Sequence, residues 1–568
     1  MSPSRRLRPR LAVLARRSAP LLAAGLLAVP ATADAGQRPP APPAELQIPA
    51  RYLQQQIGWV ACSSAVPDLR CARVAVPRDW ARPDSGEDIQ IAISKLPTTG
   101  GDKRGMVTFN PGGPGASGLG MPIGTGLVHP QLREHYDLVG FDPRGMGSSR
   151  PNVACQTEDE YRAFFGLDGR DRSPQNIART LQLSDKTAAD CRTRTGALQP
   201  YVTTWQTVRD MEFVRRLLDE PRMSYIGYSA GTWLGAHYVQ TFPQHADRFV
   251  LDSNVDFTEP WSENGNLQPL GFERRFQEDF LPWMARYDRL YHYGTSAREA
   301  RTRYEARRRA LQAQPLQIAG ITIGPADYDN GVVGVMYSKD GFPVLAQALA
   351  AIERPDALTP DDEAAIQAVF GAFFDATTYA GYFTITCGDT PWSRDPSDLV
   401  RLSERLGRRY PLLGYTWAAN PCPFWRQPYG TMQRIDGRGV PATLMVNSTH
   451  DPATPYEGAR AAHRGFRGSR FVTIRDEGDH GIYGGNPCFD QIALRFLIEG
   501  VLPRRDSSCP GVPLPDPTAA PAPQAKRAPE SLAQQAERLH EQAESPTERE
   551  DRLGREVGRQ LDAALASR

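Results

Sequence analysis

Gly227-Tyr228-Ser229-Ala230-Gly231 reads G-x-S-x-G, and its setting points to the fold. Residues 223–226 before it are β-prone, and residues 232–239 after it contain no proline. A serine between a strand and a helix is typical of a nucleophile elbow, where a tight turn lifts the hydroxyl above the sheet. The two glycines fit a strained turn at which strand and helix approach too closely for a Cβ. The alternative is a chance Gly/Ser turn, because the five-residue pattern alone is weak.

Strand-like segments recur on both sides of this turn. Apolar runs of strand length lie at 106–109, 136–141, 248–252, 442–446 and 470–474. A helical pattern at 207–218 comes before the elbow strand, and strands that alternate with helices predict a mostly parallel sheet flanked by helices. Apolar residues largely alternate in 72–76 and 89–93, which predicts an antiparallel hairpin ahead of that sheet.

The strand pattern breaks between about residues 256 and 439. The clearest helical patterns there are 272–293, 297–312, 361–374 and 397–409. A helical insertion between strands of an α/β core predicts a cap on the loops at the carboxyl ends of the strands. We therefore expect a first core part at 56–255, a large helical cap at 256–439, and a second core part with the last strands at 440–510.

The N-terminus has the features of an export signal. Arginines up to Arg17 precede an apolar run at 21–29 and then Ala33-Asp34-Ala35. This order predicts a signal peptide at 1–35 and a leader or short propeptide at 36–55. The apolar run is too short to span a bilayer, so no membrane span is expected, although an uncleaved N-terminal anchor is the alternative. We expect a secreted or cell-envelope protein.

Cysteine content and charge narrow the possibilities. The chain has eight cysteines, an even number that suits an oxidising compartment. Sequence alone does not fix the connectivity, but proximity suggests Cys62–Cys71, Cys155–Cys191, Cys387–Cys422 and Cys488–Cys509. No C-x-x-C or H-E-x-x-H occurs, so neither a metal site nor a cofactor is expected. The net charge of +1 gives no support for a nucleic-acid partner.

The composition changes beyond Cys509, where residues 511–568 predict a linker and a charged tail. Residues 510–529 are rich in proline and alanine and predict an extended linker. Narrow apolar stripes follow among charged residues, at Leu532, Ala536, Leu539, Ala543, Leu553, Val557 and Leu561. The tail is either partly helical and mostly solvated, or a docking helix for an unknown partner. We favour the first, because so little apolar surface offsets the ordering entropy.

A serine hydroxyl needs a base to take its proton and a group to hold that base. In α/β-hydrolases the chain order is Ser, then Asp or Glu, then His. Asp451 follows the strand at 442–446 and His480 follows the strand at 470–474, so both are expected at the same sheet edge as Ser229. The sequence therefore predicts an α/β-hydrolase fold with Ser229, Asp451 and His480 as the catalytic triad.

Three other residues compete for these roles. His450 adjoins Asp451 but comes before it, which is the wrong chain order, and it points the other way along an extended backbone. Asp479 adjoins His480, and side chains of sequence neighbours rarely meet. His237 lies in the helix after the elbow and is expected to be a helix-face residue.

The oxyanion of a tetrahedral intermediate needs preorganised N–H donors. One is expected from the backbone N–H of Ala230, which follows the nucleophile, and the other from a glycine-rich loop after the third core strand. That loop is 110–118, and Gly113 is the predicted donor with Gly112 as its neighbour. The alternative is a simple glycine-rich turn. The segment 142–149 is expected to brace the floor of the site.

Four segments carry a family resemblance. They are PGGPG at 111–115, GFDPRGMGSS at 140–149, GYSAGTWLG at 227–235 and TCGDTPW at 386–392. Together with the Asp451 and His480 segments, they resemble the secreted tripeptidyl aminopeptidases of actinobacteria, which are related to prolyl aminopeptidase. The resemblance covers roughly residues 57–509 and implies removal of tripeptides from peptides with free N-termini. One departure is Ala230, where tyrosine is common in the family.

The same triad would also serve a carboxylesterase or another acyl hydrolase. A third possibility is a binding protein that kept the fold, against which the intact triad order argues. An exopeptidase needs a buried carboxylate to pair with the substrate ammonium at a fixed distance from the serine. We expect it in the cap, at Glu259, Glu263 or Asp389, although each of these is individually more typical of a surface acid.

Overall fold

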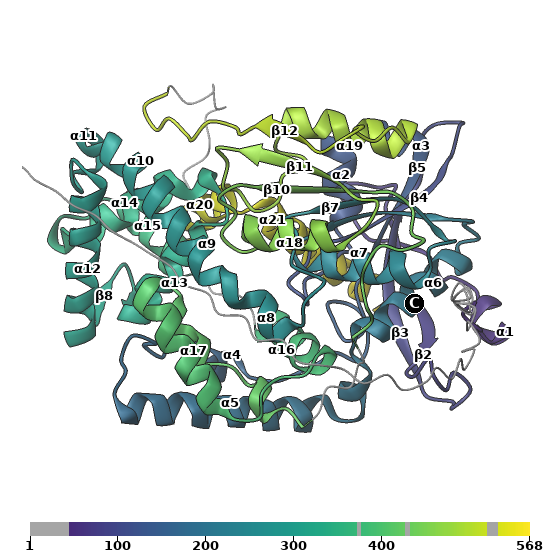
Figure 1. Ribbon diagram of the computed structural model, residues 1–568, viewed down its shortest axis with the longest axis horizontal. Coiled ribbons are helices and arrows are strands. Elements are labelled where there is room, and N and C mark those ends of the chain that lie inside the picture. Colours follow the sequence, from purple (N-terminus) through teal and green to yellow (C-terminus); the bar gives the residue numbers. More distant parts are fainter. Residues whose placement is uncertain (1–44, 372–375, 427–431, 520–531, 568) are drawn as a thin grey trace, which may run out of the picture. The chain divides into compact units, whose positions relative to one another are not determined.

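The computed structural model describes residues 45–371, 376–426, 432–519 and 532–567. Across these ranges one sheet of ten strands has the order β1-β2-β3-β5-β4-β6-β7-β10-β11-β12 (Figure 1). Its strands are β1 (Val60–Ala61), β2 (Arg70–Pro77), β3 (Asp88–Leu96), β4 (Gly105–Asn110), β5 (Tyr136–Phe141), β6 (Met223–Tyr228), β7 (Ala246–Asp252), β10 (Thr443–Ser448), β11 (Arg470–Arg475) and β12 (Ser507–Pro510). β1, β2 and β3 pair antiparallel, and every pairing from β5 to β12 is parallel. The predicted hairpin and parallel sheet are confirmed.

Helices cover both faces of the sheet. One apolar core includes residues of α6 (Thr204–Leu217), α7 (Ala230–Thr241) and α18 (Tyr456–Gly465). The other includes residues of α2 (Met121–Val128), α3 (Pro130–His135) and α19 (Pro487–Glu499). All residues of β4, β5 and β6 are buried, as expected for parallel strands covered on both sides.

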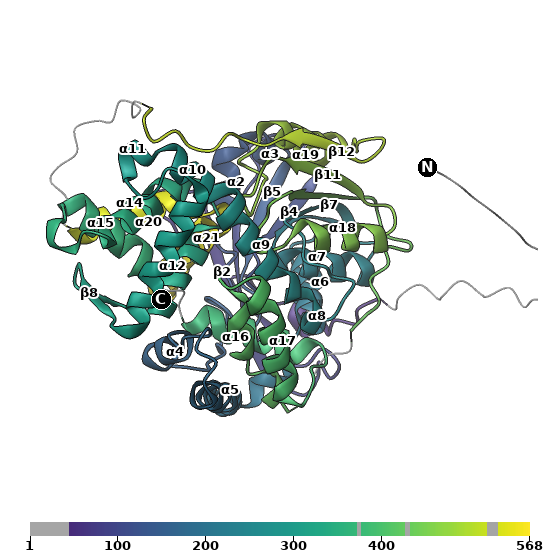
Figure 2. The ribbon, with the colours of Figure 1, turned by 60° about the vertical axis from the view of Figure 1, so that its left-hand side comes forward.

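The segment between β7 and β10 is helical and has an apolar core of its own. Its helices include α8 (Trp261–Asn264), α9 (Gln268–Arg274), α10 (Leu281–Arg286), α11 (Asp288–Tyr291), α12 (Ala297–Ala313), α13 (Pro325–Val335), η4 (Lys339–Gly341), α14 (Phe342–Ile352), α15 (Pro360–Phe370), α16 (Ala376–Asp389) and α17 (Pro396–Arg409), with a small β8–β9 hairpin at Leu316–Ile318 and Ile321–Ile323. The single helix predicted at 272–293 is instead several segments, one of them the π-helix Arg275–Phe280. Figure 2 shows these helices beside the sheet.

Two further helices belong with the cap although they precede it in sequence. α4 (Glu158–Phe165) and α5 (Pro174–Thr195) follow β5. Arg170, between them, forms ion pairs with Glu305 of α12 and Asp329 of α13, at 3.0 Å each. The sequence pattern did not reveal this part of the cap, since it interrupts the first core segment.

Four disulfides close the chain, and they are the four pairings that sequence proximity suggested. The predicted signal peptide lies outside the described residues. Of the predicted leader, residues 46–55 pack on the core through Tyr52, which is buried against Trp80 and Phe213. In the described part of the chain, no helix combines the length and apolar character needed to cross a membrane.

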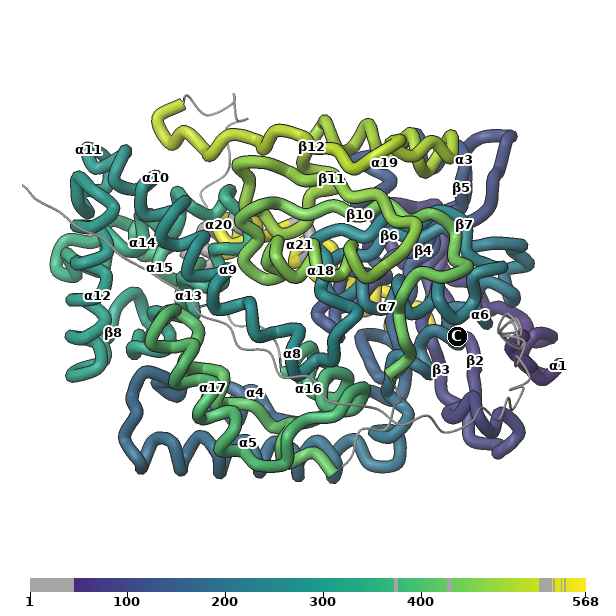
Figure 3. The backbone as a smooth tube through the Cα atoms, viewed as in Figure 1, coloured from purple at the N-terminus to yellow at the C-terminus, as the bar shows by residue number. Residues whose placement is uncertain are grey.

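The C-terminal tail contradicts the expectation of a mostly solvated segment. It forms α20 (Leu532–Ala543) and α21 (Pro546–Ala566), and its path can be followed in Figure 3. Val557 and Leu561 are 2% and 0% exposed and belong to the apolar core that holds α2 and α19. The side chains of Leu532, Ala536 and Ala543 lie outside the described set. The tail therefore docks on its own chain.

Candidate active site

The carboxyl ends of the parallel strands meet at one edge of the sheet. β6 pairs with β7, β7 with β10, and β10 with β11, all in parallel. Ser229 follows β6 directly, Asp451 follows β10, and His480 follows β11. The three predicted residues therefore emerge at the same edge, as the chain order required.

Ser229 sits at a sharp strand-to-helix turn. Its backbone has φ 55° and ψ −127°, and α7 begins at the next residue. Its N–H donates to the carbonyl of Asp252 at 3.0 Å. A Cβ on Gly227 would lie 2.6 Å from the carbonyl oxygen of Gly231, and a Cβ on Gly231 would lie 2.4 Å from that of Asn110. Both glycines are thus required by close backbone approach, as predicted.

Asp451 and His480 form a buried pair. His480 Nδ1–H donates to the Asp451 carboxylate, with distances of 3.0 and 3.1 Å to its two oxygens. Asp451 also accepts the Thr454 N–H at 2.8 Å and the Thr454 hydroxyl at 3.0 Å, which fix its orientation. Burial lowers the pKa of His480, but the charge and hydrogen bond of Asp451 outweigh it and leave that pKa above its ordinary 6.5.

The pair leaves Nε2 of His480 as the ring atom for proton transfer. Within the described residues, the hydroxyl of Ser229 makes no hydrogen bond. Serine–histidine contacts are often long in unliganded enzymes and tighten when substrate is bound.

A second acid, Asp252 at the end of β7, holds the backbone after His480. Its Oδ2 accepts the N–H groups of Ile482 at 2.9 Å and Tyr483 at 2.7 Å. Burial raises the pKa of Asp252 to about 7, and its negative charge adds to the upward shift of the His480 pKa. Asp252 was not among the residues predicted from the sequence, although its place at the end of the strand next to the elbow was a usable signal.

The competing residues have other partners. His450 Nδ1 contacts Asp279 at 2.8 Å, so it faces the cap. The Asp479 carboxylate accepts a hydrogen bond from the Lys339 ammonium at 2.6 Å. His237 is buried in α7 with burial lowering its pKa to about 4, which agrees with a helix-packing residue.

The glycine-rich loop after β4 lies directly against Ser229. Gly112 and Gly113 have φ values of 104° and 102°. A Cβ on Gly112 would lie 2.8 Å from the Cβ of Ser229. The Gly112 N–H donates to Asn110 Oδ1 at 3.0 Å. In contrast, the N–H groups of Gly113 and Ala230 have no acceptor among the described residues.

Asp142 fixes the far end of this loop. Its carboxylate accepts the Ser117 hydroxyl at 2.6 Å, the Gly118 N–H at 3.0 Å and the Ser148 N–H at 2.6 Å. Burial raises its pKa to about 6. The segment 142–149 thus ties the glycine-rich loop to the end of β5, in keeping with the expected bracing role.

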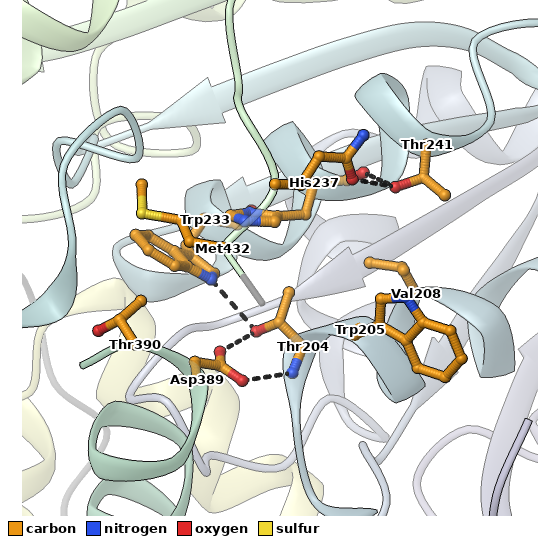
Figure 4. A pocket seen from close by; sticks show the side chains of 10 residues that line it. Thr204, Trp205, Val208, Trp233, His237, Thr241, Asp389, Thr390 and Met432 are labelled. Atoms are coloured by element: carbon orange, nitrogen blue, oxygen red, sulfur yellow. Dashed lines mark hydrogen bonds between the residues drawn. The ribbon is translucent and has the colours of Figure 1, made fainter. Parts of the chain in front are cut away.

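The three candidate carboxylates for the substrate ammonium lie in different surroundings. Glu259 and Glu263 are exposed, on either side of the buried Trp261 that begins α8, so the expectation of a buried acid is wrong for both. Asp389 is 5% exposed at the end of α16. It accepts the N–H of Thr204 at 2.9 Å and the hydroxyl of Thr204 at 2.5 Å (Figure 4).

Asp389 lines a small pocket together with Trp233, which lies on the first turn of α7 after Ser229. The Trp233 indole N–H donates to the Thr204 hydroxyl at 3.2 Å. Among the described residues no cationic side chain pairs with Asp389, and burial raises its pKa to about 6. Of the three candidates, only Asp389 is a buried acid without a counter-charge.

Two parts of the chain match known families. Residues 105–320 match the family described as alpha/beta hydrolase fold, and residues 410–509 match the family described as TAP-like protein. The tripeptidyl aminopeptidase of Streptomyces lividans is 32% identical over 476 residues, which cover 81% of this chain and 88% of that protein. The chain belongs to the tripeptidyl aminopeptidase family.

Relatives with other names share this similarity. Carboxylesterase B of Mycobacterium tuberculosis is 30% identical over 86% of this chain and 96% of its own length. Serine protease Hip1 of the same organism is 27% identical over 80% of this chain and 91% of its own length. This member of the tripeptidyl aminopeptidase family is therefore a serine hydrolase of the α/β-hydrolase fold. The TAP-like match ends at residue 509, before α20 and α21.

Proposed function

We propose that the protein is an exported serine exopeptidase that releases tripeptides from free N-termini through an acyl-enzyme on Ser229. The observation that carries the proposal is the buried Asp451–His480 hydrogen bond at the sheet edge where the elbow presents Ser229. The names of the relatives support peptide hydrolysis as the reaction.

In this mechanism His480 Nε2 takes the proton of the Ser229 hydroxyl as its oxygen attacks the scissile carbonyl. Asp451 holds the imidazole and stabilises the imidazolium that forms. The N–H groups of Gly113 and Ala230, which lack other acceptors among the described residues, donate to the oxyanion. His480 then protonates the leaving amine, and water attacks the acyl-enzyme by the reverse sequence.

We assign the recognition of the substrate ammonium to Asp389. A buried carboxylate satisfied only by neutral donors gains a counter-charge when an ammonium binds. An N-blocked peptide cannot supply that charge, so the enzyme would reject it. Glu259 and Glu263, both exposed, cannot enforce such a distance measurement.

The test of Asp389 uses Asp389→Asn, which keeps the shape and an acceptor for Thr204 but removes the charge. We expect KM for a free tripeptidyl substrate to rise about ten- to a hundredfold, the worth of a charge-assisted hydrogen bond. Hydrolysis of a small aryl ester should stay close to wild type. The exposed Glu263→Gln is the matched control. An unchanged KM for Asp389→Asn would place the ammonium elsewhere.

The overall activity is tested with matched free and N-blocked tripeptidyl chromogenic substrates and a short-chain aryl ester. We expect rapid cleavage of the free peptide only, with Ser229→Ala lowering turnover by several powers of ten, as for loss of a triad nucleophile. Equal rates on free and blocked peptides would refute the exopeptidase assignment.

The second candidate function is carboxylester hydrolysis. The relative named carboxylesterase B favours it, and the same triad and oxyanion donors would serve it. Efficient turnover of the aryl ester without cleavage of either peptide is the result that would select this function.

Export is supported by the four closed disulfides and by the arginine-rich, apolar N-terminus. Mass spectrometry of the protein recovered from culture medium and cell envelope should give a mature N-terminus after Ala35. Recovery only from the cytoplasm with residues 1–35 retained would contradict export.

A further inference from the structure

The C-terminal helix α21 lies on the glycine-rich loop next to Ser229. The Ser117 N–H of that loop donates to Asp551 Oδ1 at 2.6 Å. A Cβ on Gly554 would lie 2.4 Å from the Ser117 hydroxyl oxygen, and a Cβ on Gly120 would lie 2.4 Å from the Gly554 nitrogen. Loop and helix backbones therefore touch without intervening side chains.

The rest of α21 is attached by an apolar face and by ion pairs. Val557 and Leu561 are buried in the core that also holds α2. Asp562, 42% exposed, forms ion pairs with Arg150 at 2.9 Å and with Arg73. These contacts fix the position of the helix, but two partly exposed ion pairs and two buried aliphatic side chains make a modest attachment.

The first turn of α21 comes close to the other half of the site. The N-cap residue of α21, Ser545, is fully buried, and Glu548 lies three residues after it. The negative charge of Glu548 contributes to raising the pKa of both His480 and Tyr337. The helix thus begins near the imidazole and continues along the loop that carries Gly113.

The preceding helix α20 packs on the cap. It contacts α14, α15 and η4, and Leu539 packs against the apolar core of the cap. Arg552 of α21 pairs with Glu544, at the end of α20, at 3.0 Å. In Figure 1 the yellow α20 lies beside the cap helices α14 and α15, and the yellow α21 extends from there toward the sheet.

We propose that α20 and α21 occupy the substrate-binding surface between the cap and the glycine-rich loop, and that a peptide reaches Ser229 only when α21 leaves this surface. A substrate must contact His480 and the oxyanion donors at once, and α21 borders both: Glu548 in its first turn acts on the imidazole, and Asp551 and Gly554 contact the glycine-rich loop at Ser117. The partner of this surface is thus the chain's own C-terminal segment. The inference rests on the proposed function, because it takes Ser229, His480 and Gly113 as the reacting groups.

A reversible lock tests the inference directly. A Cβ on Gly558 would lie 3.5 Å from the Cβ of Ser148, at the short end of the range of about 3.5–4.5 Å found in disulfides. In the full-length double variant Ser148→Cys/Gly558→Cys, oxidation should hold α21 in place. We expect at least a tenfold loss of kcat/KM for the peptide on oxidation, with recovery on mild reduction.

Each single cysteine variant, treated with the same oxidant and reductant, controls for effects on the native disulfides. Gel mobility and mass confirm that the lock has closed. Equal peptide cleavage by the closed and reduced double variant would overturn the proposal.

The opposite change should open the site. Asp562→Arg places like charges beside Arg73 and Arg150 and should weaken docking of α21. We expect a several-fold fall in apparent KM, because the fraction of open enzyme sets the apparent affinity. Glu556→Arg makes the same charge change on an exposed position of the same helix and should leave KM unchanged. A melting curve for each variant shows whether the core remains folded, and an unchanged KM in a folded Asp562→Arg protein would count against the proposal.

A bulky fluorophosphonate separates this inference from the proposed function. Its labelling of Ser229 reports access to the nucleophile and does not depend on the peptide substrate. Slow labelling of the locked form and fast labelling of Asp562→Arg would support the inference even if no tripeptidyl substrate is cleaved. Equal labelling rates in all forms would refute it even if the peptidase assignment holds.

Discussion

Asp252 links the elbow to the loop that carries His480. Its carbonyl accepts the N–H of Ser229, and its carboxylate accepts the N–H groups of Ile482 and Tyr483. The hydroxyl of Ser253, the residue after Asp252, accepts the N–H of Gly481 at 2.8 Å. One residue therefore fixes the serine and the histidine relative to each other, and also places a second negative charge near the imidazole.

Asp252→Asn should shift the pH profile of acylation to lower pH. The variant keeps an oxygen to accept the two N–H groups but removes a charge that raises the pKa of His480. His480 must be neutral to act as base, so the rising limb of kcat/KM moves down with that pKa. KM should change little. A profile that keeps its midpoint while kcat falls would indicate a purely structural role.

The positions of residues were predictable where chain order and strand order constrain them. Ser229, Asp451 and His480 each follow a strand of one parallel sheet, so their shared edge followed from the sequence. Whether a given acidic residue of the cap is buried or exposed could not be predicted from the sequence in this way. Nothing in the sequence separates exposed Glu259 from buried Asp389, because their exposure depends on how the cap helices pack.

At the scale of elements, the glycine-rich loop has to approach the elbow more closely than a side chain permits. Gly112→Ala would place a Cβ 2.6 Å from the carbonyl oxygen of Tyr228, at a positive φ that alanine rarely adopts. The loop must move, and the Gly113 N–H moves with it. We expect kcat to fall by roughly 10²–10³, the effect of losing one oxyanion donor.

Gly101→Ala is the matched control for that loop variant, because its added Cβ meets no atom within 4 Å. Circular dichroism of both variants shows whether the fold is kept. A folded Gly112→Ala enzyme with wild-type kcat would show that the loop does not carry an oxyanion donor.

Elements with long, regular patterns were predictable, and the details of the cap were not. Eight of the ten described sheet strands were predicted to within a few residues, because they are apolar runs of strand length, whereas the short edge strands β1 and β12 carry too little pattern to be recognised. The helix predicted at 272–293 is broken by a π-helical segment in which Arg275 is buried and pairs with Asp479, next to His480. The π-helical segment thus carries a contact across the cap–core boundary, which periodicity does not contain.

At the scale of the molecule, the tail shows how an amphipathic stripe can be underestimated. The few apolar residues in the tail predict a solvated helix, since they offer little to offset the ordering entropy. The helix also docks at Gly554 and Gly558, where its backbone approaches Ser117 and Ser148 directly. The receiving surface is itself apolar and already ordered by the folded core. A docking partner encoded in the same chain is not visible from the helix alone.

The docking of this tail should depend on pH through Glu550 of α21. A Cβ on Gly124 of α2 would overlap its carboxylate, and its Oε2 atom is buried with no hydrogen-bond partner among the described residues. Burial raises the pKa of Glu550 to about 8, an effect that the neighbouring Arg549 only partly opposes. Burial, with a contribution from the charge of Glu550, raises the pKa of Tyr228 well above 10, so this phenol stays neutral over this range.

Because the raised pKa belongs to the docked state, docking is strongest below the ordinary carboxyl value of 4.5 and weakens as pH rises toward 8. Fluorophosphonate labelling of Ser229 should therefore increase with pH more steeply than the titration of His480 alone explains. Glu550→Gln removes the ionisation, so the tail of this variant should stay docked at high pH. Its Ser229 should be labelled several-fold more slowly than that of wild type at pH 8 to 9, and the two labelling rates should converge near pH 5. Glu556→Gln, on the exposed side of the same helix, should follow wild type. A ratio of Glu550→Gln to wild-type labelling that stays constant from pH 5 to 9 would show that this carboxylate does not control the tail.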